Sequence, residues 1–332
     1  MNRFRKLLFA AAFGAAADVA AAGPYSGLVI FGDSLSDRGN VALAIGADAT
    51  QVITNTHIPD RPYASGQFSN GDVWARSFAS ALGFASATVP SLLGGSDYAF
   101  GGARMAVDGA GLPPSLSAQA SLYLGAHAVA PGDALYIVEG GGNDARDALV
   151  AAAAAANPFA AIAAAASAYA LATGVIVDRL QAAGAQHIVV WDVPDLGTAP
   201  AVAAQGAGAS FLGTQVALAM NSALSARLFG ETGVSIFDLF GLEDDMVARP
   251  TAYGLLNVTD ACGGVVGCNP STYLFWDGIH PTSAGHAVLA QAMLAVVAVP
   301  EPATGALVVA GLVLMRLRLR RKAADAGAAC CH

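Results

Sequence analysis

Short apolar segments alternate with longer helix-like segments along this chain, and that alternation constrains the fold more than any other feature. Residues Leu28–Phe31 are all apolar, and residues 134–138, 188–193 and 235–239 have the same strand-like character. Each of the later three follows a stretch with helical periodicity. Because parallel strands need a long crossover connection, usually a helix, this order predicts an α/β fold with a mostly parallel sheet.

Glycines and prolines mark where the segments between the expected strands begin and end. Residues 159–183 carry a broad apolar stripe and end at Gly184, which predicts a long crossover helix. The alanine run at 151–156 is expected to stop before Pro158, because proline breaks a helix. Residues 40–71, with their prolines and glycines, are expected to form a long surface connection at the rim of the sheet.

The charge of the chain depends on which part is counted. Both lysines, Lys6 and Lys322, lie near the ends, and residues 23–298 contain 8 arginines, no lysine and 21 acidic residues. A surface this acidic disfavours nucleic acid and anionic lipid headgroups as partners. We predict one domain over residues 23–298, because no linker-like change of composition interrupts it.

The first 22 residues have the pattern of a secretory signal peptide. Basic residues occupy the start, residues 7–17 are apolar, and alanines at 20–22 offer a cleavage site for signal peptidase. A mitochondrial presequence is the alternative, but it fits less well because the segment has a continuous apolar run and no serine. The sequence therefore predicts an exported protein.

The other end resembles the PEP-CTERM sorting signal of Gram-negative bacteria. A Pro-Glu-Pro box at 300–302 precedes an apolar run at 303–315 and a basic stretch at 316–322. The resemblance implies transient membrane anchoring by residues 299–322, an exosortase-type sorting enzyme as partner, and a final location in the envelope, on the cell surface or outside the cell. An amphipathic tail is the alternative. No role is assigned to residues 323–332, which include Cys330, Cys331 and His332.

Two cysteines, Cys262 and Cys268, are the only ones in the body of the chain. In an oxidising compartment a pair at this spacing is expected to close as a disulfide. A zinc site is the alternative, and it is disfavoured because no histidines converge on the pair.

Ser34 is the first candidate functional residue. It follows the apolar segment Leu28–Phe31 and Gly32, at a point where a helix is expected to begin. The carboxyl end of a parallel strand faces the crevice in which such sheets bind ligands, and helix-start N–H groups there stabilise negative charge. The alternative is that Ser34 only caps the helix.

Asp277 and His280 form a second candidate pair. They are three residues apart, just before the helical pattern at 282–297, so one turn can hold the carboxylate against the imidazole Nδ1–H. Pro281 presets the start of that helix. His286 lies too far along the chain to share this turn, and we expect a structural role for it.

Gly102 and Asn143 are candidate hydrogen-bond donors. Gly102 belongs to a paired-glycine segment whose backbone can approach a ligand closely, and Asn143 follows the strand expected at 134–138. Taken singly, both are typical of ordinary turns.

Taken together, these segments resemble the GDSL esterase/lipase family of the SGNH hydrolase superfamily, in its secreted bacterial branch. The matching blocks are 32–37, 98–103, 141–144 and 277–280. Further family landmarks, with no chemistry assigned, are 68–74, 193–197 and 257–262.

The resemblance implies a three-layer α/β/α flavodoxin-like fold and acyl transfer without a cofactor or metal. Ser34 is expected to be the nucleophile, His280 the general base, and Asp277 the group that fixes the imidazole tautomer. The oxyanion hole is expected to consist of the Ser34 N–H, the Gly102 N–H and the Asn143 side-chain amide.

The same resemblance leaves the substrate open. A small-molecule ester, a lipid, a phospholipid and an O-acetylated surface polysaccharide are all compatible with it, so an esterase, lipase, phospholipase or O-deacetylase is expected. A hypothesis of another class is a surface or biofilm matrix protein that keeps the fold without turnover.

Overall fold

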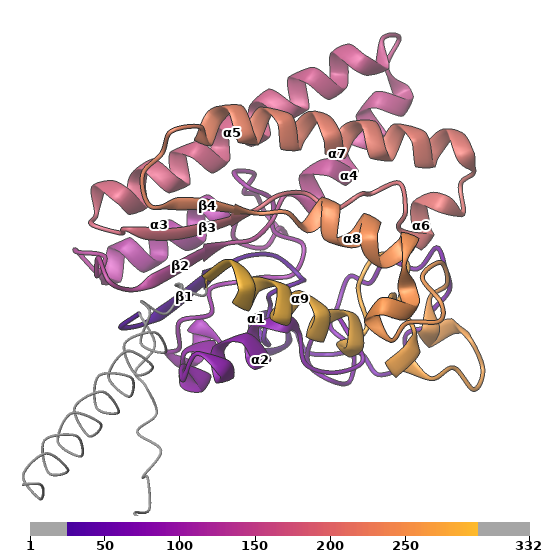
Figure 1. Ribbon diagram of the computed structural model, residues 1–332, viewed down its shortest axis with the longest axis horizontal. Helices are drawn as coiled ribbons and strands as arrows, with labels where there is room; N and C mark the ends of the chain where they lie inside the picture. The colour runs from indigo at the N-terminus through magenta and orange to yellow at the C-terminus, as the bar shows by residue number, and fades with distance from the viewer. Residues whose placement is uncertain (1–24, 298–332) are drawn as a thin grey trace, which may run out of the picture.

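The computed structural model describes residues 25–297, and Figure 1 shows their arrangement. The strands are β1 (Leu28–Phe31), β2 (Leu135–Val138), β3 (His187–Trp191) and β4 (Val234–Phe237). The helices are α1 (Asn40–Ile45), α2 (Trp74–Ala81), α3 (Leu116–Ala126), α4 (Gly142–Ala154), α5 (Pro158–Ala182), α6 (Pro200–Ala203), α7 (Ala207–Leu228), α8 (Leu239–Ala248) and α9 (Ser283–Val297). Short 3-10 helices lie at Ala85–Thr88, Ser91–Leu93, Pro250–Tyr253, Cys262–Gly264 and Pro270–Thr272.

The sheet is parallel throughout the described residues, with strand order β1-β2-β3-β4. A single parallel bridge between Ile30 and Asp97 adds one further position beside β1. With that position counted as a strand, the order becomes 2-1-3-4-5, the order of flavodoxin-like sheets. After β1 the chain adds the position at Asp97 on one side of β1, and it then returns to add β2 on the other side. The strand order reverses between β1 and β2, and folds of this type bind ligands at the carboxyl ends of the strands at such a switch point.

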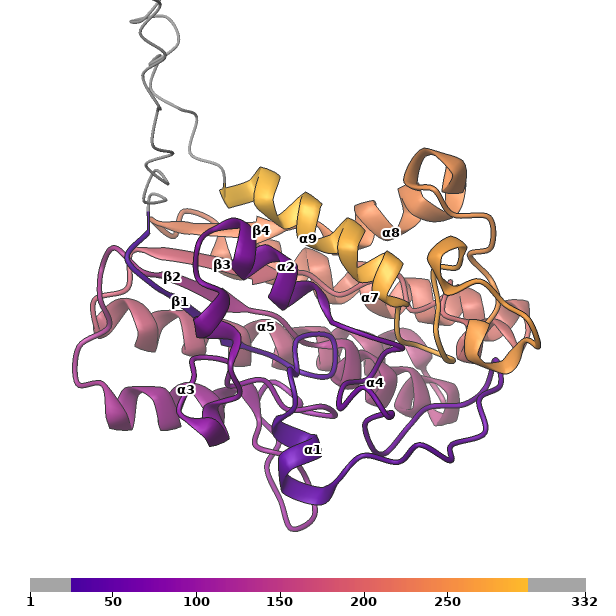
Figure 2. The ribbon, with the colours of Figure 1, turned by 90° about the horizontal axis from the view of Figure 1, so that it is seen from below.

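Two hydrophobic cores lie on opposite faces of the sheet, as expected for strands whose side chains alternate. Val29 and Phe31 of β1 belong to the core that also contains side chains of α3, α4, α5 and α7. Leu28 and Ile30 belong to the core shared with α2, α8 and α9. Figure 1 shows the two helical layers on either side of the sheet, and Figure 2 shows α2 and α9 side by side. The expected three-layer α/β/α fold is confirmed.

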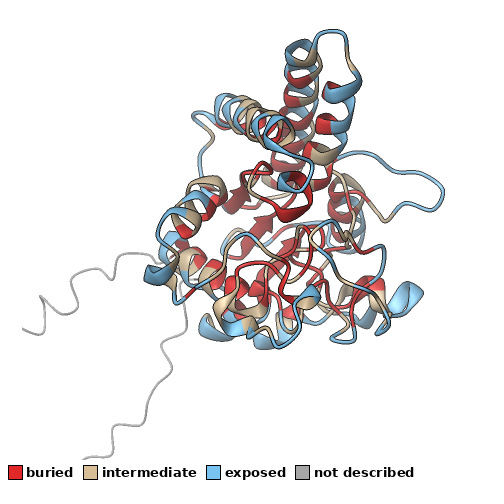
Figure 3. Ribbon diagram, turned by 90° about the vertical axis from the view of Figure 1, so that its right-hand side faces the viewer, coloured by how far each residue is buried: buried red, intermediate tan, exposed pale blue. Residues whose placement is uncertain are grey.

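Burial follows this layering, because β1, β2 and most of β3 are buried, β4 at the sheet edge is only partly buried, and the outer helix faces are exposed (Figure 3). Helix α5 is apolar and long enough to cross a membrane, yet its buried residues belong to the core beneath it. We therefore interpret α5 as a core helix. It begins at Pro158, one residue before the predicted start, and the side chain of Asn157 accepts a hydrogen bond from the Ala160 N–H.

Two local predictions were wrong. Ser34 does not begin a helix, because it lies in a turn closed by the Asp37 N–H to Asp33 carbonyl bond (3.0 Å), and α1 begins only at Asn40. Residues 40–71 are not wholly a surface connection. They include α1, and Tyr63 is among several of their side chains that are buried.

The predicted signal peptide (1–22), sorting signal (299–322) and tail (323–332) lie outside the described residues. Their assignments stay predictions.

Candidate active site

Ser34 lies at the carboxyl end of β1, in the turn that replaces the expected helix. The Asp33 side chain accepts a hydrogen bond from the Leu35 N–H (3.0 Å) and so fixes the turn around the serine. The hydroxyl of Ser34 is 2.8 Å from His280 Nε2. The sequence therefore placed Ser34 at the correct edge of the sheet although it assigned the wrong local structure.

His280 connects Ser34 to Asp277. The Nδ1 atom of His280 is 2.7 Å from Asp277 Oδ2. Because an ionised carboxylate only accepts hydrogen bonds, this contact places the imidazole proton on Nδ1 and leaves Nε2 to accept the serine proton. The ring of Phe68 lies 5.5 Å from the imidazole, centre to centre, and limits its movement. Ser34 and the pair His280 and Asp277, from two distant parts of the sequence, thus form one continuous hydrogen-bonded array.

The Asp277 carboxylate is fully buried, and four donors satisfy it. Its Oδ1 atom accepts from the backbone N–H groups of Ile279 (2.8 Å) and His280 (2.7 Å). Its Oδ2 atom accepts from His280 Nδ1 and from the Tyr63 hydroxyl (2.7 Å). Burial and the neighbouring Asp277 charge raise the pKa of Tyr63, so this hydroxyl remains a donor. Sequence reasoning missed Tyr63, because nothing in its local sequence indicates a contact with a residue so far along the chain.

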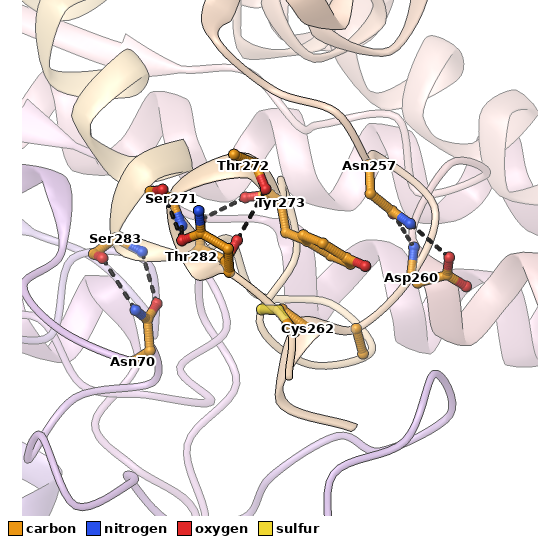
Figure 4. Close-up of a disulfide and its surroundings, with 12 residues drawn as sticks. Asn70, Asn257, Asp260, Cys262, Ser271, Thr272, Tyr273, Thr282 and Ser283 are labelled. Carbon is orange, nitrogen blue, oxygen red and sulfur yellow. Dashed lines mark hydrogen bonds between the residues drawn. A yellow bond between two sulfur atoms is a disulfide. The ribbon is translucent and has the colours of Figure 1, made fainter. Parts of the chain in front are cut away.

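Residues 69 and 70 hold the start of α9 beside the array. Ser69 donates a hydrogen bond to the carbonyl of Pro281 (2.9 Å). Asn70 accepts from the Ser283 N–H (2.9 Å) and donates to the Ser283 hydroxyl (3.2 Å), as Figure 4 shows. The landmark segment 68–74, which had no assigned chemistry, therefore fixes the helix that follows His280.

The disulfide predicted between Cys262 and Cys268 is present (Figure 4). The Cys262 N–H donates to the carbonyl of Phe275 (3.0 Å), and the Gly263 N–H donates to that of Trp276 (3.0 Å). The disulfide loop is thus hydrogen-bonded to the two residues that precede Asp277. This contact gives the loop a role in supporting the array.

Gly102 lies in a loop that is hydrogen-bonded to the segment following β1. Its backbone has φ = 82°, a left-handed conformation in which a side chain is strained. The Asp37 carboxylate accepts from the Gly101 N–H (2.9 Å), and the Asn40 amide donates to the carbonyls of Asp97 and Ala99. Asp97 uses both carboxylate oxygens as acceptors, toward the Arg38 and Ala99 N–H groups.

Asn143 lies in the first turn of α4, which starts at the carboxyl end of β2. Its side-chain amide donates to Asp33 Oδ2 (3.2 Å) and to the carbonyl of Ala103 (3.0 Å). Both amide hydrogens therefore have partners. The next residue, Asp144, accepts from the Met105 N–H (3.1 Å) and ties α4 to the same loop, and burial raises its pKa to about 6.

A buried acidic pair lies directly beneath Ser34. Glu139 Oε2 accepts from the Asp33 N–H (3.2 Å) and from the Ser36 hydroxyl (2.8 Å). Burial raises the pKa of both Asp33 and Glu139, and the neighbouring Asp33 charge raises the pKa of Glu139 further. His286 is also buried, and burial lowers its pKa to about 3, so it stays neutral near neutral pH.

The array opens into a pocket whose volume, with open solvent included, is about 710 Å³. Ser34, Asn143 and His280 lie in its wall. Most of the remaining wall is apolar and includes Leu35, Leu196, Leu239, Met246, Leu274, Phe275, Ile279 and Leu289. Two charged residues in this wall, Arg146 and Glu243, were not predicted from the sequence.

Glu243 is buried in the pocket wall, where its carboxyl accepts a hydrogen bond from the Thr198 hydroxyl (3.1 Å). Burial raises its pKa to about 8. Near neutral pH the group is therefore mainly an uncharged acid. Among residues 25–297 no group of three or more His, Cys, Asp or Glu side chains is placed to hold a metal ion.

The fold and the array together define the class of this protein. A serine, a histidine and an aspartate bonded in series at the carboxyl edge of a parallel sheet are typical of α/β proteins of the serine hydrolase type.

Comparison with known proteins narrows the class to a family. Residues 28–293 match the family described as GDSL-like Lipase/Acylhydrolase. The chain belongs to this family, as the sequence motifs predicted.

Individual proteins and one solved structure are also similar to this chain. Esterase EstA of Pseudomonas aeruginosa is 30% identical over 345 aligned residues, which cover 85% of this chain and 48% of the relative. A Pseudomonas putida protein named for the trpE-trpG intergenic region is 29% identical over 85% of this chain and 50% of its own. The chain thus spans about half the length of these relatives. The crystal structure of phospholipase A1 from Streptomyces albidoflavus NA297 covers 82% of this chain and 99% of its own, with 17% identity and a TM-score of 0.42.

Proposed function

We propose that this protein is an exported serine hydrolase that cleaves carboxylic esters through an acyl-enzyme on Ser34. The observation that carries the proposal is the hydrogen-bonded series from Ser34 Oγ to His280 Nε2 (2.8 Å) and from His280 Nδ1 to Asp277 (2.7 Å). Both distances lie within the reach required for proton transfer and for orienting the base.

In the proposed reaction the Ser34 oxygen attacks the ester carbonyl while its proton moves to His280 Nε2. The tetrahedral intermediate collapses, the bond to the alcohol oxygen breaks, and His280 donates the proton to that oxygen. Water then attacks the acyl-enzyme by the same steps and releases the acid. Asp277 holds the imidazole tautomer and stabilises the imidazolium formed in between.

Stabilisation of the intermediate is assigned to the side of the site that carries Gly102. Neither the Ser34 N–H nor the Gly102 N–H has a hydrogen-bond acceptor among residues 25–297. Both are thus free to bind the negative oxygen. For Asn143 to join them, its amide must exchange one existing partner for the oxyanion. The longer contact, to Asp33 at 3.2 Å, is the one we expect to be replaced.

The apolar pocket wall supports an acyl chain longer than acetyl as the group beside Ser34. Burial of apolar surface contributes about 0.8 kcal/mol per CH₂ group, so chain length is expected to raise kcat/KM until the pocket is filled. An ester of a lipid or other small molecule fits this wall better than an O-acetyl polysaccharide. Phospholipid and acetylated polysaccharide remain the alternative substrates of the proposal.

Export and sorting are part of the proposal and rest on residues 1–22 and 299–322. We propose that signal peptidase and an exosortase-type enzyme process the two ends, with transient membrane anchoring between these events. The protein then acts in the Gram-negative envelope, on the cell surface or outside the cell. Pulse-chase labelling of the two ends in the native host tests this, and persistence of both segments would contradict it.

Hydrolysis of p-nitrophenyl esters from acetate to palmitate tests the chemistry. We expect the purified protein to cleave them, Ser34→Ala to abolish cleavage, and the rate to peak above acetate. Ser121→Ala is the matched control, because Ser121 is an exposed serine on α3 that donates to the Ser117 carbonyl. If the folded protein shows no serine-dependent hydrolysis, the result would favour the non-catalytic surface protein instead.

A further inference from the structure

Arg146 stands at the mouth of the pocket, one helical turn after Asn143 on α4. Its side chain is partly buried, and one guanidinium nitrogen lies 3.4 Å from Asn143 Oδ1. Ser34 and His280 line the same pocket. Arg146 is thus a cation placed close to the reacting atoms, in a protein whose acidic residues outnumber its arginines more than twofold over residues 23–298.

Within residues 25–297, Arg146 lacks the carboxylate partner that most arginines there have. Five of the eight arginines in residues 25–297 lie within 4 Å of a carboxylate oxygen, and Arg146 is not among them. The paired arginines are Arg38, Arg76, Arg104, Arg227 and Arg249. A partly buried cation without a paired anion carries a desolvation cost that an arriving anion offsets.

The acidic groups of the pocket do not fill this role. Asp33 accepts from the Leu35 N–H and from Asn143. Asp195 is turned toward the Gly197 N–H (2.9 Å) and the Thr214 hydroxyl (2.7 Å). Glu243 is mainly uncharged near neutral pH because burial raises its pKa to about 8. The guanidinium therefore keeps donors available for a ligand.

Arg146 also separates the catalytic pocket from a second hollow on the surface. Arg146 and Ile279 line both, and the second hollow continues along apolar residues of α4 and α6, including Val150 and Val202. A substrate part that extends from Ser34 toward the second hollow therefore passes Arg146.

We propose that Arg146 binds an anionic group, a phosphate or a carboxylate, that the ester substrate carries beside its scissile bond. This inference rests on the proposed function, and it specifies that the ester substrate is negatively charged. The planar guanidinium matches both anions, because two of its N–H groups can donate in parallel to two oxygens.

Matched substrate pairs test the proposal with the full-length protein. The first pair is 4-(butyryloxy)benzoate and its uncharged methyl ester, which differ in one carboxylate. The second pair is dibutyryl phosphatidylmethanol, below its micelle concentration, and dibutyrylglycerol, which differ in one anionic methyl phosphate group. The quantity compared is kcat/KM for the anionic substrate divided by kcat/KM for the neutral one.

We expect Arg146→Gln to lower this ratio by about tenfold or more in at least one pair, since a charge-assisted hydrogen bond is lost. Arg146→Lys should retain part of the ratio. Arg179→Gln is the control of equal charge, because Arg179 lies on α5 and donates to Ser117 and Ser121, away from the pocket. The pair that responds identifies the anion. A ratio that falls less than this in both pairs overturns the proposal.

A binding measurement keeps the proposal separate from catalysis. Butyl phosphate and 4-hydroxybenzoate, which carry the two kinds of anion, are titrated separately by calorimetry into Ser34→Ala and into Ser34→Ala with Arg146→Gln. Saturable binding of either anion that the second substitution weakens about tenfold or more supports the anion site even if no ester is hydrolysed. Absence of binding of both anions, or binding that survives the loss of Arg146, overturns it. Loss of serine-dependent hydrolysis alone counts against the proposed function and not against this site.

Discussion

The two sides of the site differ in how completely the protein satisfies its own polar groups. On the Asp277 side every carboxylate oxygen has two donors, supplied by Tyr63, Ile279 and His280. On the opposite side the N–H groups of Ser34 and Gly102 have no acceptor among the described residues, and only the Asn143 amide is bonded.

This difference follows from the proposed roles of the two sides. A buried carboxylate that holds a histidine tautomer must be fixed before the substrate arrives, because each missing hydrogen bond would carry a desolvation cost. Donors for an oxyanion must instead stay open, since they are meant to bind a charge that exists only during the reaction. The comparison predicts which substitutions slow the reaction most.

The largest effect of the following three substitutions is expected from Asn143→Ala. Removal of an oxyanion donor should lower kcat by about 10²- to 10³-fold with a small change in KM. Steady-state kinetics on a p-nitrophenyl ester measure this. Asn157→Ala is the control, because that asparagine caps α5 outside the site. Unchanged turnover in Asn143→Ala would mean that its amide keeps Asp33 and Ala103 as partners throughout the reaction.

A smaller effect is expected from Tyr63→Phe, which removes one of four donors to Asp277. The three remaining donors keep the carboxylate in place, so we expect kcat to fall about tenfold with KM unchanged. Tyr25→Phe is the control, since Tyr25 donates to the Val297 carbonyl. A loss as large as that of Asn143→Ala would show that the Asp277 side is less rigid than its hydrogen bonds indicate.

The smallest effect on turnover is expected from Glu243→Gln in the pocket wall. This substitution should instead change how the free energy of unfolding depends on pH. Because the folded-state pKa of Glu243 is raised to about 8, the unfolded chain loses this proton at lower pH than the native protein. The group therefore lowers the free energy of unfolding progressively as pH rises from about 4.5 toward 8.

Urea denaturation at pH 5 and pH 8 tests this expectation. Glu243→Gln should lose less stability over that range than the wild type, by on the order of 1 kcal/mol per pH unit. The other carboxyls with raised pKa values, such as Asp192 (about 7), titrate in both proteins and cancel. Glu231→Gln, at an ion pair with Arg227, is the control. Equal slopes for wild type and Glu243→Gln would refute the raised pKa.

Much of the fold could be predicted because local patterns agree with the final structure. Four apolar segments became parallel strands, and Asn157 with Pro158 set the start of α5. The pairing of Asp277 with His280 was also predictable, because three residues of sequence separate them and one turn holds them together. Ser34 was placed at the correct sheet edge but was wrongly assigned to a helix start.

Contacts over long sequence distances were beyond the local patterns. Tyr63 reaches Asp277 across 214 positions, and the bonds of Asn70 to Ser283 span 213. Nothing in the local sequence distinguishes Arg146 from the other seven arginines of residues 25–297, and only the folded chain shows that it lines the pocket with no carboxylate partner among those residues.

The sequence by itself determined the α/β class, the family blocks and the residue types of the array, because these depend on periodicity and on spacing along the chain. The tertiary structure decided which polar groups of the site have hydrogen-bond partners. Asp277 has four donors, whereas within residues 25–297 the N–H groups of Ser34 and Gly102 have no acceptor and the guanidinium in the pocket wall has no carboxylate partner. The physical reason is that a hydrogen bond or an ion pair depends on distance in space, which packing of the two cores sets and local sequence does not encode.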